Sequence, residues 1–197
     1  MIKFSATLLN TFSLFLNDEG DYYTEQKVLD SINRNIVMTD KMNIGKQFGE
    51  MLYDKLPHNE EIVICGQSIR PDIINAIRKE IDIENASAEV YCEIMIDNNI
   101  KLYGYADFVN RRLFEVKTTS TIDYMKYKNM VQHKVYSLAL NLPDTCYIIT
   151  DFNTWTKEEY LLNLIQVKHE LYLLSRRFVE FIDSHKESIN FEFITVK

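Results

Sequence analysis

The sequence predicts an α/β protein in which helices flank a mixed β-sheet. Helical patterns occupy the first part of the chain, and strand-like segments then follow one another from Ala88 to Lys117. Another helix and another strand come after them. Strands joined by short turns pair antiparallel, whereas a crossover helix returns the chain to a parallel strand. Both kinds of pairing are therefore expected in one sheet.

The first part of the chain is expected to hold helices and one strand. Ser5 suits an N-cap, and apolar residues recur at helical spacing over 5–16. The stretch at 43–56 has the same character. The β-branched run "EIVICG" at 61–66 predicts a strand. A helix is predicted at 70–81, because proline stands in its first turn and isoleucines recur at helical spacing.

The second part is expected to hold an antiparallel meander, then a helix, a strand and a long C-terminal helix. Turns at 97–99 and 110–112 separate the strands of the meander. The segment at 158–166 fits a strand as well as a helix. The expected strands lie at 88–96, 100–109, 113–119 and 145–152, and the expected helices at 122–142 and 167–185.

Length and composition indicate one domain. The 197 residues, of which 46% are hydrophobic, can form a substantial core, and the domain is expected to span 1–197. The segment at 1–23 has a broken apolar run and one lysine, so neither a signal peptide nor a membrane span is expected, and the predicted location is cytoplasmic. Three widely spaced cysteines favour buried reduced thiols over disulfides or a metal cluster.

The net charge restricts the classes of function. A formal charge of −7 and a pI near 5.2 exclude a protein that coats nucleic acid nonspecifically, because such binding depends on many phosphate contacts by lysine and arginine. An enzyme that acts on nucleic acid remains compatible with this charge, since it can concentrate positive charge in one groove.

Three charged side chains are expected to converge in the meander. Side chains alternate along a strand, so Glu115 and Lys117 share one face. If the connection spans only 110–112, Asp107 falls opposite Glu115. A hard divalent cation between the two carboxylates would make this arrangement favourable, with the lysine beside it. The alternative is a solvated polar face whose ion pair contributes less than about 1 kcal/mol.

Four segments in this order resemble the PD-(D/E)xK nuclease superfamily and, more narrowly, its RecB-type exonuclease branch. "FSATLLNTF" at 4–12 resembles the N-terminal helix of the branch, and "IGKQFGEML" at 44–52 is similar to its Gly-x-x-apolar-His-x-x-Leu helix. The stretch from 104 to 119 resembles the G-x-x-D and E-x-K core, and "QHKVY" resembles the Q-x-x-x-Y helix. The matching positions are Gly104, Asp107, Glu115, Lys117, Gln132 and Tyr136.

The chain departs from the branch at one position. Gly49, followed by Glu50, stands where many of these nucleases have a histidine metal ligand. Glu50, Glu89 and Glu93 are the acids that could replace it, and the sequence does not choose among them.

The resemblance implies a restriction-endonuclease-like sandwich with a bound Mg²⁺ or Mn²⁺. The implied ligands are Asp107, Glu115 and the main-chain carbonyl of Val116, with Glu89 as a further candidate. Lys117 would orient the attacking water and stabilise developing negative charge. The scattered cysteines do not match the iron–sulfur members, so no iron–sulfur cluster is expected.

The same resemblance implies contacts with nucleic acid. Gln132 and Tyr136, one helical turn apart, would contact the nucleic-acid backbone or the catalytic lysine, although Tyr136 could instead be a packing residue. Lys134 and Arg111 are candidates for phosphate contacts. Gly104 indicates either a close approach by the substrate backbone or a kink in the strand.

The function implied by the resemblance is metal-dependent hydrolysis of DNA phosphodiester bonds. The branch implies an exonuclease or end-processing enzyme of recombination, repair or phage DNA metabolism, acting on linear ends or single strands. The alternative is a catalytically inactive nuclease-fold module that binds DNA or protein. A homo-oligomer and a recombination partner protein both remain open.

Overall fold

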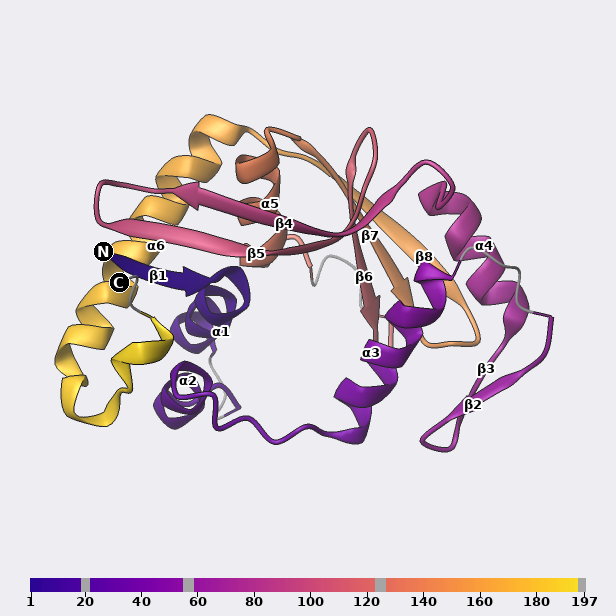
Figure 1. The fold of residues 1–197 in the computed structure, drawn as a ribbon, viewed down its shortest axis with the longest axis horizontal. Helices are drawn as coiled ribbons and strands as arrows, with labels where there is room; N and C mark the ends of the chain where they lie inside the picture. Colours follow the sequence, from indigo (N-terminus) through magenta and orange to yellow (C-terminus); the bar gives the residue numbers. More distant parts are fainter. Residues whose placement is uncertain (19–21, 55–58, 123–126, 195–197) are drawn as a thin grey trace.

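The computed structural model describes residues 1–18, 22–54, 59–122 and 127–194 (Figure 1). These residues form a six-stranded mixed sheet flanked by helices, as the sequence predicts, and a separate two-stranded hairpin. The strands of the main sheet are β1 (Ile2–Ser5), β4 (Ser87–Met95), β5 (Ile100–Val109), β6 (Leu113–Thr118), β7 (Asp144–Thr150) and β8 (Trp155–Leu161).

The position of β5 determines the shape of the sheet. β4 pairs antiparallel with β5 along most of its length and takes one of its two edges. β1 and β6 must therefore share the other edge. β1 pairs in parallel with 100–103, whereas β6 pairs antiparallel with 108–109. β1 and β6 thus leave residues 104–107 of β5 without a partner among the described strands on this edge, and we call this gap the fork. β7 and β8 extend the sheet beyond β6.

Helices surround the sheet on both sides. In Figure 1, α3 and α4 lie at one end of the molecule, and α1, α2 and α6 lie at the other end, close to both termini. The helices are α1 (Ala6–Asn17), α2 (Glu25–Ile32), α3 (Asp40–Tyr53), α4 (Pro71–Ile81), α5 (Val131–Leu140) and α6 (Leu164–Ser184). Strands β2 (Ile62–Ile64) and β3 (Gln67–Ile69) form the separate hairpin.

Local sequence explains where several helices begin. The side-chain oxygens of Ser5, Thr24 and Thr39 each accept a hydrogen bond from a backbone N–H of the first turn of α1, α2 and α3. These bonds satisfy donors that a helix leaves unpaired at its N-terminus. Asn163 caps α6 in the same way.

The core of the described residues consists of two large apolar clusters and a small one around Tyr127, Tyr147 and Ile149. One gathers residues of α1, α2, α5, α6, β1 and β5, with Phe4 and Phe178 in edge-to-face contact. The other joins α3 and α4 to the opposite side of β6 and β7, where Phe48, Phe114 and Ile148 are buried. The site described below lies where the two clusters meet. Among the described residues, no helix combines the length and apolar character that crossing a membrane requires.

Several expected boundaries are wrong. β1 and α2 were not predicted, and neither was β3, which follows the strand expected at 61–66. The helix expected at 122–142 begins only at Val131, because 127–129 form a turn that buries Tyr127 against Tyr147; 123–126 lie outside the described residues. The ambiguous segment at 158–166 contains the end of β8 and the start of α6.

Gly104 has a packing role that differs from both expected ones, a close approach by the substrate backbone and a kink in the strand. A Cβ atom at this position would lie 2.5 Å from Cε1 and 2.8 Å from Oη of Tyr136. The absence of a side chain therefore lets the Tyr136 ring of α5 rest directly on β5.

Gly104→Ala should destabilise the protein by about 1–3 kcal/mol, because β5 and α5 must separate to accommodate the methyl group. Gly49→Ala is the matched control, since its Cβ would meet only Oη of Tyr53, at 3.9 Å. That change in the interior of α3 should raise stability by roughly 0.5–1 kcal/mol. Urea denaturation measures both effects, and an unchanged stability of Gly104→Ala would contradict the packing described.

Candidate functional site

The candidate site begins where β5 and β6 separate. The ladder between them contains the pairs Phe108–Phe114 and Val109–Leu113, so the connection is three residues long, as expected. At Asp107, the residue of β5 that precedes these pairs, a hydrogen bond from a side chain replaces the backbone pairing with β6. Oδ2 of Asp107 accepts a hydrogen bond from the backbone N–H of Val116 at 2.7 Å.

Glu115 lies beside Asp107 and is almost completely buried, with 1% of its surface exposed. Its Oε2 accepts a hydrogen bond from Nζ of Lys117 at 3.0 Å. Its Oε1 is buried and has no hydrogen-bond partner among the described residues. An unpartnered buried acceptor costs about 1–3 kcal/mol, and more when the group is charged. The structure thus brings Asp107, Glu115 and Lys117 together.

The surroundings oppose the ionisation of both carboxyl groups. Burial and then the charge of Asp107 raise the pKa of Glu115 to about 7. Burial also raises the pKa of Asp107. Burial alone would lower the pKa of Lys117, but the two carboxylates outweigh it and raise that pKa. Lys117 therefore remains a cation at neutral pH.

A cavity of about 600 Å³ lies between α3 and this fork. Asp107, Val116, Lys117 and Thr118 line it from the sheet, and Gln132 lines it from α5. The side of α3 that faces the cavity contributes Lys41, Met42, Gly45, Lys46, Gly49, Glu50 and Tyr53. Asp107 and Lys117, the neighbours of the buried Glu115, therefore border a space large enough for a ligand.

Glu89 is the acid of β4 that lies at this cavity. It stands opposite Asp107 in the ladder, between the pairs Ala88–Phe108 and Val90–Ala106. Its φ of +48° is unusual for a residue other than glycine and marks a local distortion of the strand. The hydroxyl of Tyr53 donates a hydrogen bond to Oε1 of Glu89 at 3.3 Å.

The structure shows which of the acids that could replace the absent histidine ligand lie at the cavity. Gly49 faces the cavity from α3, and Glu50 lines it as well. Glu93 lies farther along β4, outside the lining of this cavity, and binds Lys3 at 3.3 Å and Lys101 at 2.9 Å. Hydrogen bonds from Tyr91 and then from these lysines lower the pKa of Glu93 to about 2. Glu89 and Glu50 therefore remain as candidates.

The two residues of the Q-x-x-x-Y pattern have different positions. Nε2 of Gln132 donates a hydrogen bond to Oγ1 of Thr7 at 3.0 Å, and the side chain also borders the cavity. Tyr136 is only 2% exposed and packs on Gly104. Burial, followed by the charges of Glu115 and Asp107, raises its pKa. The cover by β5 favours the alternative in which Tyr136 is a packing residue, and a contact of this residue with nucleic acid stays a prediction.

The two expected phosphate contacts also lie away from the cavity lining. Nζ of Lys134 is 2.9 Å from Oε2 of Glu170 in α6. Gln132 and Lys134 are two residues apart on a helix and so face different directions, a spacing that the sequence already contains. Arg111 is exposed in the connection between β5 and β6.

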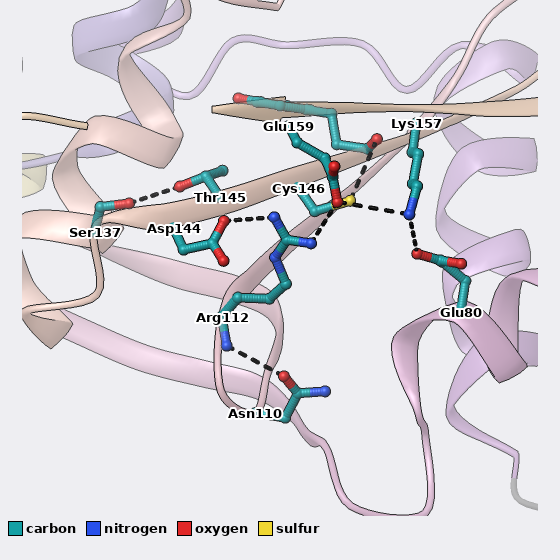
Figure 2. Close-up of polar contacts among 10 residues, drawn as sticks. Glu80, Asn110, Arg112, Ser137, Asp144, Thr145, Cys146, Lys157 and Glu159 are labelled. Atoms are coloured by element: carbon teal, nitrogen blue, oxygen red, sulfur yellow. Dashed lines mark hydrogen bonds and ion pairs between the residues drawn. The ribbon is translucent and has the colours of Figure 1, made fainter. Parts of the chain in front are cut away.

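Arg112, the next residue, has a structural role. Its guanidinium contacts Asp144 at the start of β7 and lies 2.5 Å from Oε1 of Glu159 in β8 (Figure 2). Lys157 of β8 lies 3.5 Å from Glu159 and 2.7 Å from Glu80 of α4. These ion pairs hold the connection against β7, β8 and α4.

Sequence reasoning missed the glycine face of α3. A Cβ atom on Gly45 would lie 3.0 Å from Oγ1 of Thr118, so this position lets α3 approach β6 closely. Gly45 and Gly49 are four residues apart and share the cavity side of the helix. The four-residue spacing of these two glycines is the feature of the sequence that could have predicted this face of α3.

A neutral aromatic layer lies behind Lys117. Nζ of Lys117 is 5.9 Å from the ring centroid of Tyr147, whose hydroxyl lies 2.8 Å from Nδ1 of His133. Burial lowers the pKa of His133 to about 3. The imidazole is therefore uncharged at neutral pH and does not compete with Lys117 for the carboxylates.

No protein-family model matches the chain, and no curated protein matches it. Solved structures that match include one titled "Crystal structure of SSO0001", with a TM-score of 0.45 and 14% sequence identity. The match covers 87% of this chain and 75% of the other. Similarity at this level does not identify a family.

In metal-free protein, the carboxyl group of Glu115 should titrate near pH 7. Carbon NMR of the glutamate side chains measures the midpoint. Asp107→Asn should lower it, because a neighbouring negative charge is removed. Glu50→Gln is the control and should leave the midpoint unchanged, since the side chain of Glu50 is 57% exposed. A wild-type midpoint close to the ordinary value of about 4.3 would contradict the electrostatic description.

Proposed function

We propose that this chain is a divalent-metal-dependent nuclease that hydrolyses phosphodiester bonds of DNA. One observation carries the proposal. Among the described residues, Oε1 of Glu115 has no hydrogen-bond partner, and this buried side chain lies beside Asp107, which lines a cavity of about 600 Å³. A cation at this position would provide the missing partner.

The available ligands fit a hard cation such as Mg²⁺ or Mn²⁺, which binds oxygen atoms. No group of three or more His, Cys, Asp and Glu side chains suited to a metal occurs within the described part of the chain. Asp107 and Glu115 would therefore be joined by the main-chain carbonyl of Val116, and Glu89 supplies an acid on the opposite strand. When bound, such an ion polarises a phosphate and lowers the pKa of water.

The lysines around the cavity have complementary roles. Lys117 remains charged and lies next to Glu115, so it would orient an attacking water and stabilise negative charge that develops on the phosphate. Its raised pKa keeps the amine protonated at neutral pH, so it has no lone pair to accept a proton and its contribution is electrostatic. Lys41 and Lys46 line the cavity from α3 and would bind the phosphates that flank the scissile bond.

The resemblance to the PD-(D/E)xK superfamily supports DNA as the substrate and an exonuclease or end-processing activity. Gly49 favours a second candidate, a module that binds DNA or protein without catalysis, because the histidine ligand is missing. The convergence of Asp107, Glu115 and Lys117 argues against it, since a module without catalysis would not need a buried carboxylate oxygen to which no described residue donates a hydrogen bond.

Wild-type protein should degrade end-labelled linear DNA with Mg²⁺ or Mn²⁺ but not with EDTA. Lys117→Ala should reduce the rate by on the order of a hundredfold or more, because a charge aimed at the reacting phosphate is lost. Lys134→Ala is the matched control, since its lysine pairs with Glu170 away from the cavity, and it should retain full activity.

Thermal unfolding shows whether each variant remains folded. Equal activity of wild type and folded Lys117→Ala would refute the assigned role of this lysine. Absence of metal-dependent cleavage by the wild type would favour the binding module.

A further inference from the structure

One face of the β4–β5 hairpin is open and aromatic. Leu102, Gly104 and Ala106 are buried on one side of β5, so Tyr103 and Tyr105 point to the other side. Tyr91 of β4 pairs with Tyr105, and their ring centroids are 5.4 Å apart. Tyr105 is 58% exposed and Tyr91 is 45% exposed.

Cations accompany these rings. Nζ of Lys3 is 4.8 Å from the ring centroid of Tyr103 and 5.7 Å from that of Tyr91. Lys3 and Lys101 both bind Glu93, so two positive charges face one negative charge. These three side chains therefore sum to one positive charge, although the whole chain has a net charge of −7. This excess suits a polyanion.

The rings enclose a hollow of their own. Lys3, Tyr91, Tyr103, Tyr105 and Phe193 line a cavity of about 450 Å³. We call the three tyrosines and Lys3 the tyrosine face. Tyrosines in a core would be covered by other side chains, whereas these border open space.

The tyrosine face continues into the candidate site. Tyr105 precedes Asp107 by two residues on β5, and Tyr91 follows Glu89 by two residues on β4. Asp107 and Glu89 both line the cavity below α3. The same two strands therefore carry the aromatic rings and the acids of the proposed metal site, so a ligand on the rings lies directly beside that site.

We infer that the tyrosine face binds single-stranded nucleic acid and leads it to the candidate site; this inference rests on the proposed nuclease function. Unpaired bases stack on aromatic rings with little dependence on sequence, and lysines bind the phosphates between them. In a duplex the base faces are already stacked on one another and are not available. The substrate class is therefore a single strand, or the single-stranded end of a duplex.

Binding is tested without cleavage by fluorescence anisotropy of a short labelled oligothymidine in EDTA. The double variant Tyr91→Ala/Tyr105→Ala should lose about 5- to 150-fold in affinity for each base that no longer stacks. Tyr105→Phe retains the ring and should bind like the wild type. Tyr172→Ala removes a tyrosine of α6 that is 39% exposed, and it should also bind like the wild type.

The outcomes separate this inference from the proposed function. Metal-dependent cleavage with unchanged oligothymidine binding in the double variant would overturn the tyrosine face and leave the nuclease intact. Tyrosine-dependent binding by a wild type that does not cleave would support the face alone. An equal loss of affinity for blunt duplex would overturn the preference for single strands. No binding of oligothymidine by the wild type would overturn the inference. If the double variant in that case had a different sedimentation coefficient from the wild type, the tyrosine face would be a contact with another protein chain.

Discussion

The hydrogen bond between the Asp107 carboxylate and the backbone N–H of Val116 is the contact on which the site depends. It forms where β6 leaves β5, beside the middle of β5, which lies between the part that pairs with β6 and the part that pairs with β1. A side chain thus holds the two strands together at the position where backbone pairing stops. That geometry sets Asp107 next to Glu115 and opens the space that α3 covers. A regular hairpin would have closed this space with ladder bonds.

This arrangement puts a carboxyl group whose ionisation is unfavourable into the core. Glu115 is buried, one of its oxygens lacks a hydrogen-bond partner in the part of the chain that the structure describes, and its charged neighbours there include Asp107 and Lys117. The aromatic rings of Tyr136 and Tyr147 lower the local polarity further and supply no positive charge. Such a cluster is unfavourable for folding by itself, since an ionised carboxylate loses its hydration on burial. A bound cation would relieve it, and residues that carry strain of this kind are typical of functional sites.

Short-range patterns predicted part of this account. Alternation along β6 placed Glu115 and Lys117 on one face, and the short connection placed Asp107 close to them, because both depend only on neighbouring residues. The strand β1 escaped notice since it has four residues and pairs with a segment far along the chain. The role of Gly104 depends on the Tyr136 ring from another element, and the choice between Glu89 and Glu93 depends on which part of β4 borders the cavity below α3. Such long-range contacts are not visible in sequence spacing.

The central claim is that a divalent cation joins Asp107 and Glu115, and calorimetric titration with Mn²⁺ tests it most directly. Wild-type protein should bind Mn²⁺ and release protons near pH 7, because Glu115 must ionise to bind the metal. Folded Glu115→Gln should lose this binding, whereas Glu93→Gln should retain it, since Glu93 lies in the cluster with Lys3 and Lys101. No binding by the wild type, or equal binding by Glu115→Gln, would contradict the account.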